Sequence, residues 1–365
     1  MALYHNVFPE KFMKGYGMFS VGNHGWMDHP KPVAGPLDAI VRPTYLAPCS
    51  SDTHCMHGGA GPMTDCIMGH EAIGEVVEVG SLVKNFKPGD VVVVPANSPD
   101  WTAPGVQHGF GQHEYHAMSG MKFVLSKDGV FAEFFHVNHA DSNMVLLPPS
   151  IDPWAALMTV DMMSTGFHGV DRAEVNFGDV AVVMGVGPVG LSAVAACKLR
   201  GAGRIIVVET ETRAKRIALA KEYGATDSVD FEKGNPAELV RALCPEGVDA
   251  VIICGGTADN LRYAMEMTRP GGVVSTVNFF DVTEVFTFPS LSWGLGMNDV
   301  SLRAGFCRGG AERLRRLLNV IQYGRFDPSK MVTHRFEGFE KIEDAFLLME
   351  RKPADMIKPG VHIKW

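Results

Sequence analysis

The pattern of apolar and polar residues along the first half of the chain is that of a β-rich domain. Residues 71–80 alternate apolar and polar side chains, as a half-buried strand does. Residues 91–94 are consecutive valines and indicate a strand with apolar residues on both faces. The segment 39–47 predicts a strand that delivers Cys49 just beyond its end, and another strand is expected at 131–137. This half is therefore predicted to be mostly β.

The pattern changes after about residue 150. Asp152 followed by Pro153 predicts the start of a helix, since Asp is a good N-cap and Pro is favoured in the first turn. The continuation of this helix carries Asp161. Continuous apolar runs, typical of buried parallel strands, then alternate with helical segments. The strands are expected at 180–184, 204–208, 250–254 and 272–278, and the helices at 191–199 and 260–267. Repeated strand and helix units predict a doubly wound parallel sheet.

The end of the chain leaves this alternation. Two amphipathic helices are expected at 311–323 and 339–349, followed by a strand at 357–363 that returns to the first domain. A chain of 365 residues is too long for one ordinary core, so two domains are expected. The predicted fold class is α/β. A mostly β catalytic domain would comprise residues 1–164 and 303–365, and a Rossmann doubly wound domain would comprise residues 165–302.

A glycine-rich turn follows the strand expected at 180–184. Gly185, Gly187 and Gly190 form a Gly-x-Gly-x-x-Gly pattern that opens the next helix, and Val189 lies within the same turn. The pattern alone is weak evidence. Here it follows a strand, precedes a helix, and has an acid, Glu209, nineteen residues past Gly190 at the end of the second strand. That context is the fingerprint of a dinucleotide-binding site.

Cys49 and His70 are candidate ligands of a catalytic zinc ion. Thiolate and imidazole are donors that zinc prefers, and a catalytic site takes three protein ligands from distant loops while leaving one position open. Taken singly, Cys49 could be a small buried apolar residue and His70 a hydrogen-bonded core histidine. Ser51 and His54 follow Cys49 and supply a hydroxyl and an imidazole for a proton path. Glu71 is a candidate alternate ligand or an acid beside the ligands; the other interpretation is a buried acid with a nearby hydrogen-bond partner.

Composition excludes several classes of function. The net charge of -8 arises from interspersed acids, which argues against a nucleic-acid surface. No run of about eighteen uncharged apolar residues is present, so no membrane span is expected. Seven scattered cysteines do not suggest a disulfide framework and are typical of an intracellular protein. The first twelve residues lack the apolar core of a signal peptide, and a cytoplasmic location is therefore expected.

Several motifs together resemble those of the zinc-dependent medium-chain alcohol dehydrogenases. The motifs are Cys49-x-Ser51-x-x-His54, Gly69-His70-Glu71, Lys87-Pro88-Gly89-Asp90, Asp161-Met-Met-Ser-Thr-Gly-Phe-His-Gly169 and Gly185-Val-Gly-Pro-Val-Gly190. The resemblance runs from about Met13 to the C-terminus. Within the family, the Asp-Met-Met at Asp161 and the Val137-Asn138 pair are similar to those of the secondary alcohol (isopropanol) dehydrogenases of anaerobic bacteria and protists.

This resemblance implies a GroES-like fold for the catalytic domain and a specific set of roles. Asp161 would be the third zinc ligand and belong to the catalytic residues, together with Ser51 and His54. Because no cysteines lie between Pro95 and Met121, the structural zinc of many relatives is not expected, and one zinc ion per chain is implied. The implied activity is the interconversion of small secondary alcohols and ketones with a nicotinamide cofactor. The implied assembly is a homotetramer.

Two other functions remain open. A polyol or sugar dehydrogenase could use the same scaffold, but its pocket would need more hydrogen-bonding groups. Met118, Met121, Trp293 and Met297 suggest an apolar pocket instead, although methionine is also a common core filler. A non-catalytic nucleotide-binding or zinc-storing protein is the third hypothesis, since fold does not determine function. Ser51 and His54 would serve no purpose in zinc storage.

The cofactor preference depends on the end of the second strand. Glu209 there can accept hydrogen bonds from the ribose hydroxyls of NAD, and its charge repels the 2′-phosphate of NADP. The relatives implied by the resemblance mostly use NADP and have a small residue at this position. Arg213 lies just beyond Glu209 and could swing over a phosphate. The sequence therefore favours NAD and leaves NADP open.

Overall fold

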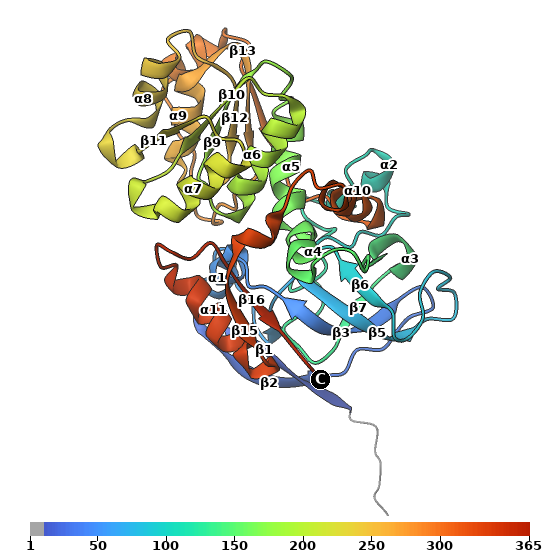
Figure 1. Ribbon diagram of the computed structural model, residues 1–365. Helices are drawn as coiled ribbons and strands as arrows, with labels where there is room; N and C mark the ends of the chain where they lie inside the picture. The colour runs from blue at the N-terminus through green and yellow to red at the C-terminus, as the bar shows by residue number, and fades with distance from the viewer. Residues whose placement is uncertain (1–10) are drawn as a thin grey trace, which may run out of the picture.

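The computed structural model of the chain describes residues 11–365. The first ten residues, which include most of the segment expected to lack a signal peptide, lie outside the described residues. The chain forms two bodies, one above the other in Figure 1. Both the first described strands and the C-terminus lie in the lower body. Within the described residues, no helix is both long enough and apolar enough to cross a membrane.

The lower body is built mainly of β-strands, as predicted. One sheet has the order β15-β16-β3-β5-β6-β8 with β7 also paired to β3, and a smaller sheet has the order β2-β1-β4. The strands are β1 (Phe12–Ser20), β2 (Asn23–Pro30), β3 (Ala39–Leu46), β4 (Cys66–Ile67), β5 (Ala72–Val79), β6 (Val91–Val94), β7 (Phe135–Val137), β8 (Val145–Leu146), β15 (Val332–Glu337) and β16 (Lys358–His362). Strand β16 pairs antiparallel with β3, which confirms that the C-terminal strand returns to the first half of the chain.

The upper body contains the predicted parallel sheet. Its order is β11-β10-β9-β12-β13-β14, so the chain reverses direction across the sheet at β9, as in Rossmann-type folds. The strands are β9 (Val180–Met184), β10 (Arg204–Val208), β11 (Asp227–Val229), β12 (Val248–Ile253), β13 (Thr268–Thr276) and β14 (Ser301–Ala304). Alternate residues of the central strands enter two different cores: Val183 packs with Leu191 of one helix layer, and Val182 packs with Val240 and Leu261 of the other. This division explains why these strands are apolar on both faces.

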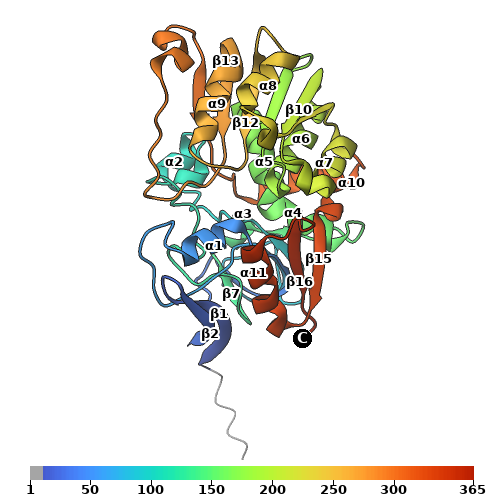
Figure 2. The same cartoon turned by 90° about the vertical axis from the view of Figure 1, so that its left-hand side faces the viewer.

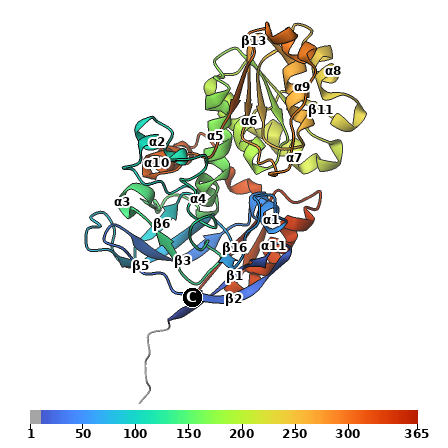
Figure 3. The ribbon, with the colours of Figure 1, turned by 180° about the vertical axis from the view of Figure 1, so that it is seen from behind.

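The helices are divided between the bodies: some cover both faces of the upper sheet, and the others lie in the lower body or where the two bodies meet (Figures 1 and 3). They are α1 (Ser50–Met56), α2 (Pro104–Gln107), α3 (Ala140–Asn143), α4 (Pro153–Val160), α5 (Met162–Arg172), α6 (Pro188–Arg200), α7 (Ala214–Tyr223), α8 (Pro236–Leu243), α9 (Asp259–Met267), α10 (Ala311–Gln322) and α11 (Ile342–Arg351). Figure 2 shows α1 on the side of the lower body that faces the upper one. The junction of α4 and α5 lies where the bodies meet.

Strand β14 was not predicted. It pairs parallel with β13 at the edge of the sheet and ends at Ala304, two residues beyond the domain boundary expected at residue 302. Two of its four residues are half-buried and two are exposed, and its sequence, Ser-Leu-Arg-Ala, lacks the continuous apolar run that marked the central strands. The domain boundaries themselves stay a prediction.

The helix that begins after Asp152 is interrupted at Asp161. Asp152 caps it as predicted, since its Oδ1 accepts a hydrogen bond from Trp154 N at 3.0 Å. The expected continuous helix is instead two helices, α4 and α5, because Asp161 has φ -132° and ψ -63°. The Val160 carbonyl accepts a hydrogen bond from Ala96 N at 3.2 Å. A backbone group from outside the helix thus satisfies one of the end carbonyls of α4. The break places Asp161 between the two helices.

Candidate active site and metal centre

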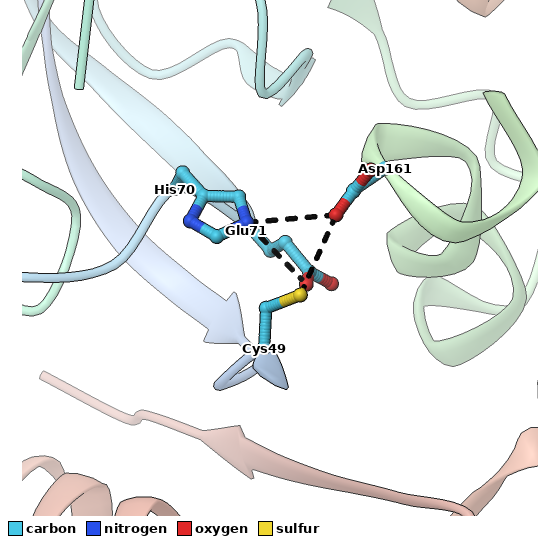
Figure 4. A group of neighbouring side chains, drawn as sticks. All are labelled: Cys49, His70, Glu71 and Asp161. Atoms are coloured by element: carbon cyan, nitrogen blue, oxygen red, sulfur yellow. Dashed lines mark hydrogen bonds and ion pairs between the residues drawn. The ribbon is translucent and has the colours of Figure 1, made fainter. Parts of the chain in front are cut away.

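Four side chains with metal-binding atoms converge between the two bodies. Cys49, His70, Glu71 and Asp161 each offer one donor atom, and these atoms all lie within 4.8 Å of one another (Figure 4). Cys49 is the N-cap residue of α1 just after β3, and the His70-Glu71 pair directly precedes β5. Asp161 comes from the break between α4 and α5. Three separate stretches of chain therefore supply the donors, as catalytic zinc sites require.

The donor separations fit a tetrahedral ion. Zinc bonds of about 2.0–2.3 Å at tetrahedral angles place neighbouring donor atoms roughly 3.3–3.8 Å apart. His70 Nε2 lies 3.5 Å from Asp161 Oδ2, and Cys49 Sγ lies 3.7 Å from the same oxygen. One sulfur, one nitrogen and one carboxylate oxygen form a donor set that suits zinc. The three residues predicted as ligands are thus brought together with spacing that would hold the ion.

Glu71 is placed differently from the other three. Its Oε1 is 3.9 Å from His70 Nε2 and only 2.6 Å from Lys358 Nζ on β16. Both Glu71 and Lys358 are fully buried, and Glu71 Oε2 has no hydrogen-bond partner. Burial raises the pKa of the Glu71 carboxyl, and the Lys358 ammonium opposes that rise. The structure therefore contains the nearby hydrogen-bond partner that the alternative interpretation of Glu71 expected, and it leaves one carboxylate oxygen beside the candidate ligands.

Two further residues hold the ligands and were not predicted. Asp52 Oδ1 lies 3.1 Å from His70 Nδ1, which leaves Nε2 to face the other donors. The Thr165 hydroxyl donates to Asp161 Oδ1 at 2.6 Å. Burial disfavours the charged His70 ring, but the Asp52 and Asp161 carboxylates raise its pKa well above the usual value. A signal for Asp52 was present in the sequence, because it stands three residues after Cys49 in a capping-box position.

Ser51 and His54 lie on α1 and have different environments. The four side chains of Cys49, His70, Glu71 and Asp161 are called the metal cluster below, since they could hold the ion. Ser51 Oγ is 3.5 Å from His70 Nε2, so its hydroxyl lies at this cluster. His54 is three residues further along and thus on the same face of the helix. Its Nδ1 lies 2.9 Å from Asp281 Oδ1, a partner that the sequence did not indicate.

A largely apolar cavity opens onto the cluster. It is lined by Ser51, Asp52, Cys55, Ala60, His70, Ala96, Met118, Met121, Val124, Leu125, Asp161, Phe279, Phe306 and Cys307. Met118 and Met121 line it, as the apolar-pocket hypothesis expected. Trp293 and Met297 do not: Trp293 Nε1 donates to the Val300 carbonyl, and Met297 is largely exposed. All the polar side chains of the lining belong to the metal cluster or contact it.

The three glycines of the dinucleotide pattern have distinct structural reasons. Gly185 has φ +83°, a conformation that disfavours other residues. A Cβ on Gly190 would lie 1.9 Å from the Gly185 carbonyl oxygen, so α6 can pack against the loop only with glycine there. A Cβ on Gly187 would meet no protein atom within 4 Å, and Gly187 is the N-cap residue of α6. Open space at a helix N-terminus suits a pyrophosphate group. Val189 lies half-buried in the first turn of α6.

Glu209 directly follows β10, and its side chain turns toward this loop. Only 3% of Glu209 is exposed. Its Oε2 accepts a hydrogen bond from Val186 N at 3.2 Å, and its Oε1 accepts one from Thr210 N at 3.1 Å. Arg213 Nη1 is 3.8 Å from Oε1, and Arg216 Nη1 is 4.0 Å from Oε2. The predicted cofactor residues Gly185, Gly187, Val189, Gly190, Glu209 and Arg213 therefore lie around one end of the parallel sheet.

The chain belongs to the zinc-dependent medium-chain alcohol dehydrogenase family and lies close to the isopropanol dehydrogenases. Residues 35–149 match the model of the alcohol dehydrogenase GroES-like domain, and residues 188–322 match that of the zinc-binding dehydrogenases. The chain is 51% identical to the NADP-dependent isopropanol dehydrogenase of Thermoanaerobacter brockii over 351 residues, which cover 96% of this chain and 99% of that protein.

Another relative and a solved structure agree with this assignment. The NADP-dependent isopropanol dehydrogenase of Entamoeba histolytica is 46% identical over 97% of this chain and 96% of its own length. The structure of alcohol dehydrogenase TADH from Thermus sp. ATN1 matches with a TM-score of 0.82 and 29% identity, and the match covers 96% of this chain and 100% of that one. The predicted combination of a Rossmann-type sheet with a GroES-like domain is confirmed.

Proposed function

We propose that this protein is a zinc-dependent oxidoreductase that interconverts small secondary alcohols and ketones, transferring hydride to and from a nicotinamide cofactor. The observation that carries the proposal is the opening of the Cys49, His70 and Asp161 cluster onto an apolar cavity. The names of the two isopropanol dehydrogenases above, which match almost the whole chain, support the same substrate class.

Cys49, His70 and Asp161 would hold the zinc ion, with Glu71 beside them. Zinc bound there would act as a Lewis acid that lowers the pKa of an alcohol hydroxyl. Asp52 holds the His70 ring through Nδ1, and Thr165 holds the Asp161 carboxylate, so both ligands are oriented before the ion arrives. Lys358 Nζ donates a hydrogen bond to Glu71 Oε1, so only Oε2 of Glu71 has no partner in the protein and could bind the ion.

Ser51 and His54 would carry the proton. The Ser51 hydroxyl at the metal cluster accepts the proton of the alcohol while donating its own outward, and His54, on the same face of α1, passes a proton to solvent. In ketone reduction the same groups return it. The glycine loop would place the cofactor pyrophosphate at the N-terminus of α6, which directs the nicotinamide toward the cavity between the bodies.

The cavity favours alcohols with small apolar substituents over polyols. A sugar or polyol carries several hydroxyl groups, and each would lose its hydrogen bonds to water among Met118, Met121, Val124 and Leu125. The experiment is a measurement of bound metal together with reduced-cofactor formation from 2-propanol and from sorbitol. We expect zinc to be bound and 2-propanol to be the better substrate by kcat/KM. A better rate with sorbitol would favour the polyol dehydrogenase, and zinc binding without turnover would favour the non-catalytic protein.

Between the two nicotinamide cofactors we propose NAD. Glu209 stands where the adenosine ribose of the cofactor is bound in this fold, and a carboxylate there accepts hydrogen bonds from ribose hydroxyls and repels a phosphate. The relatives named above are described as NADP-dependent, which points the other way. Arg213, near Glu209, would have to face a 2′-phosphate for NADP to bind well.

The proposal also covers the domain division, the assembly and the cellular location of the protein. The division into 1–164 with 303–365 and 165–302 is proposed from the sequence pattern, and limited proteolysis would test it. A homotetramer is implied by the family resemblance, and light scattering on the purified protein would measure the assembly. A cytoplasmic location is proposed because all seven cysteines are unpaired, which suits a reducing compartment.

A further inference from the structure

His54 is held by a residue from the other body of the molecule. His54 lies on α1 in the lower body, whereas Asp281 follows β13 of the upper sheet. Their side chains meet with His54 Nδ1 2.9 Å from Asp281 Oδ1. Because α1 faces the upper body, this contact spans the two bodies (Figures 1 and 2). The outer end of the proposed proton path is therefore assembled from both halves of the fold.

The backbone around this pair is shaped to bring it together. Val282 N donates a hydrogen bond to the Gly59 carbonyl at 2.9 Å, and Gly59 N donates to the His54 carbonyl at 2.7 Å. A Cβ on Gly59 would lie 2.3 Å from Asp281 Oδ1, so the carboxylate reaches His54 only because residue 59 is glycine. Phe279, which lines the cavity, packs against the His54 ring at a centroid distance of 5.3 Å.

The pair is too exposed to serve mainly as a stabilising ion pair. The side chains of His54 and Asp281 are 36% and 41% exposed, and ion pairs at such positions contribute little to folding. The contact from Asp281 to Nδ1 does, however, determine which ring nitrogen of His54 carries the proton. In the neutral ring the proton then resides on Nδ1 and the lone pair on Nε2, so one nitrogen is set as the acceptor.

We propose that Asp281 is a positioning residue for His54, supplied by the cofactor-binding body to the proton path of the catalytic body. The inference rests on the proposed function. His54 accepts a proton at Nε2 from the Ser51 side of the path and releases it from the same atom to solvent. Asp281 Oδ1 keeps the Nδ1 proton in place and holds the ring in its orientation while the proton passes through Nε2. The path is complete only while the loop after β13 rests on α1.

The test is a double-mutant cycle in the full-length, zinc-loaded enzyme. Asp281→Ala should lower kcat for alcohol oxidation about tenfold, less than the roughly 10²-fold expected for His54→Ala, because it disturbs the base without removing it. The cofactor KM and the zinc content should not change. In the His54→Ala background, Asp281→Ala should have no further effect, since its role acts through His54.

Three more variants sharpen the cycle. Asp281→Asn keeps an oxygen that can accept the Nδ1 proton, so its kcat should lie between those of the wild type and Asp281→Ala. Gly59→Ala should reproduce the loss although the carboxylate is still in the chain. Glu284→Ala removes an exposed acid from the same loop and should behave like the wild type.

Two outcomes would overturn the proposal. One is an equal loss of kcat from Asp281→Ala in the wild-type and in the His54→Ala background. The other is a change in cofactor KM with kcat unchanged, which would indicate that Asp281 only holds the two bodies together and has no role in proton transfer. Failure of the proposed function itself is distinguishable, because the wild type would then not oxidise secondary alcohols despite binding zinc and cofactor.

Discussion

The glycine loop is built from one short stretch of chain, whereas the metal cluster takes its side chains from three stretches that are far apart. In the loop, the backbone conformation of Gly185 and the close approach at Gly190 are local necessities. In the cluster, Asp161 reaches His70 only because a helix breaks at Asp161 and a β-strand begins just after His70. The conformation of the loop is therefore determined by its own residues, whereas the geometry of the cluster depends on the packing of the whole lower body.

The largest effect is expected from removing a metal ligand. Cys49→Ala or His70→Ala should leave a folded protein that binds cofactor but contains little zinc and has negligible turnover, because the ligands sit at strand and helix ends while the sheets carry the fold. Metal analysis, cofactor titration and a steady-state assay would measure this. Asp52→Ala is the matched comparison, since it removes the support of His70 and the hydrogen bond from Cys49 N but no candidate ligand. It should cost less, about 10–100-fold in zinc affinity or activity. Full turnover in zinc-free protein would contradict the mechanism.

Ser51→Ala separates proton transfer from metal binding. The substitution should lower kcat by roughly 10²-fold, within the range for loss of acid–base help, while zinc stays bound. Rapid-mixing measurement of a single turnover would follow hydride transfer directly. Ser50→Ala is the control, because the Ser50 hydroxyl contacts Met349 and not the cluster. A rate of hydride transfer equal to that of the wild type would remove Ser51 from the path.

The two regions also differ in how far sequence alone could predict them. The loop, its strand and its helix follow from a contiguous pattern, and the structure has them where expected. Cys49 and His70 were recognisable as donors, but Asp161 stood inside an apparently continuous helix and became a ligand candidate only through the family resemblance. Lys358 and Asp281 gave no local signal, because each acquires its partner across more than two hundred residues.

Strand β14 and the kink at Asp161 were missed for related reasons. An edge strand needs no continuous apolar run, and Ser301 to Ala304 has none. At the break, the Val160 carbonyl pairs with Ala96 N, a long-range contact that helix periodicity does not contain. Trp293 and Met297 were assigned to the pocket from their side-chain type alone. Local patterns thus predicted most elements, and the errors lie where distant segments decide the geometry.

A matched pair of glycine substitutions tests whether Gly187 serves cofactor binding and Gly190 serves packing, as the loop geometry implies. Gly187→Ala should keep the stability of the protein but raise the cofactor KM about tenfold, because its Cβ enters open space meant for the pyrophosphate. Gly190→Ala should instead lower stability by about 1–3 kcal/mol, since its Cβ collides with the Gly185 carbonyl. Thermal unfolding and steady-state kinetics would distinguish them, and zinc content should stay normal for Gly187→Ala. A stability loss from Gly187→Ala equal to that from Gly190→Ala would contradict the assignment of these roles.

The smallest effect is expected at Glu209. This side chain is expected to change the preference for NAD over NADP and to leave the rate with the preferred cofactor unchanged. Two unit charges about 5 Å apart at an effective dielectric constant near 20 interact by roughly 3 kcal/mol. Arg213 and Arg216 lie within 4.0 Å of the Glu209 carboxylate and offset part of its charge. About tenfold discrimination against NADP is therefore expected, measured as the ratio of kcat/KM with NAD to that with NADP.

Glu209→Gly should shift this ratio toward NADP by about the same factor, since it removes the charge and leaves Arg213 free to meet the 2′-phosphate. Glu211→Gly is the control: Glu211 is exposed and pairs with Lys233, so its loss should change the ratio less. Both variants should retain zinc and activity, because neither residue contacts the metal cluster. A wild type that prefers NADP, as its named relatives do, or a ratio unmoved by Glu209→Gly, would show that the acid at the end of β10 does not select the cofactor.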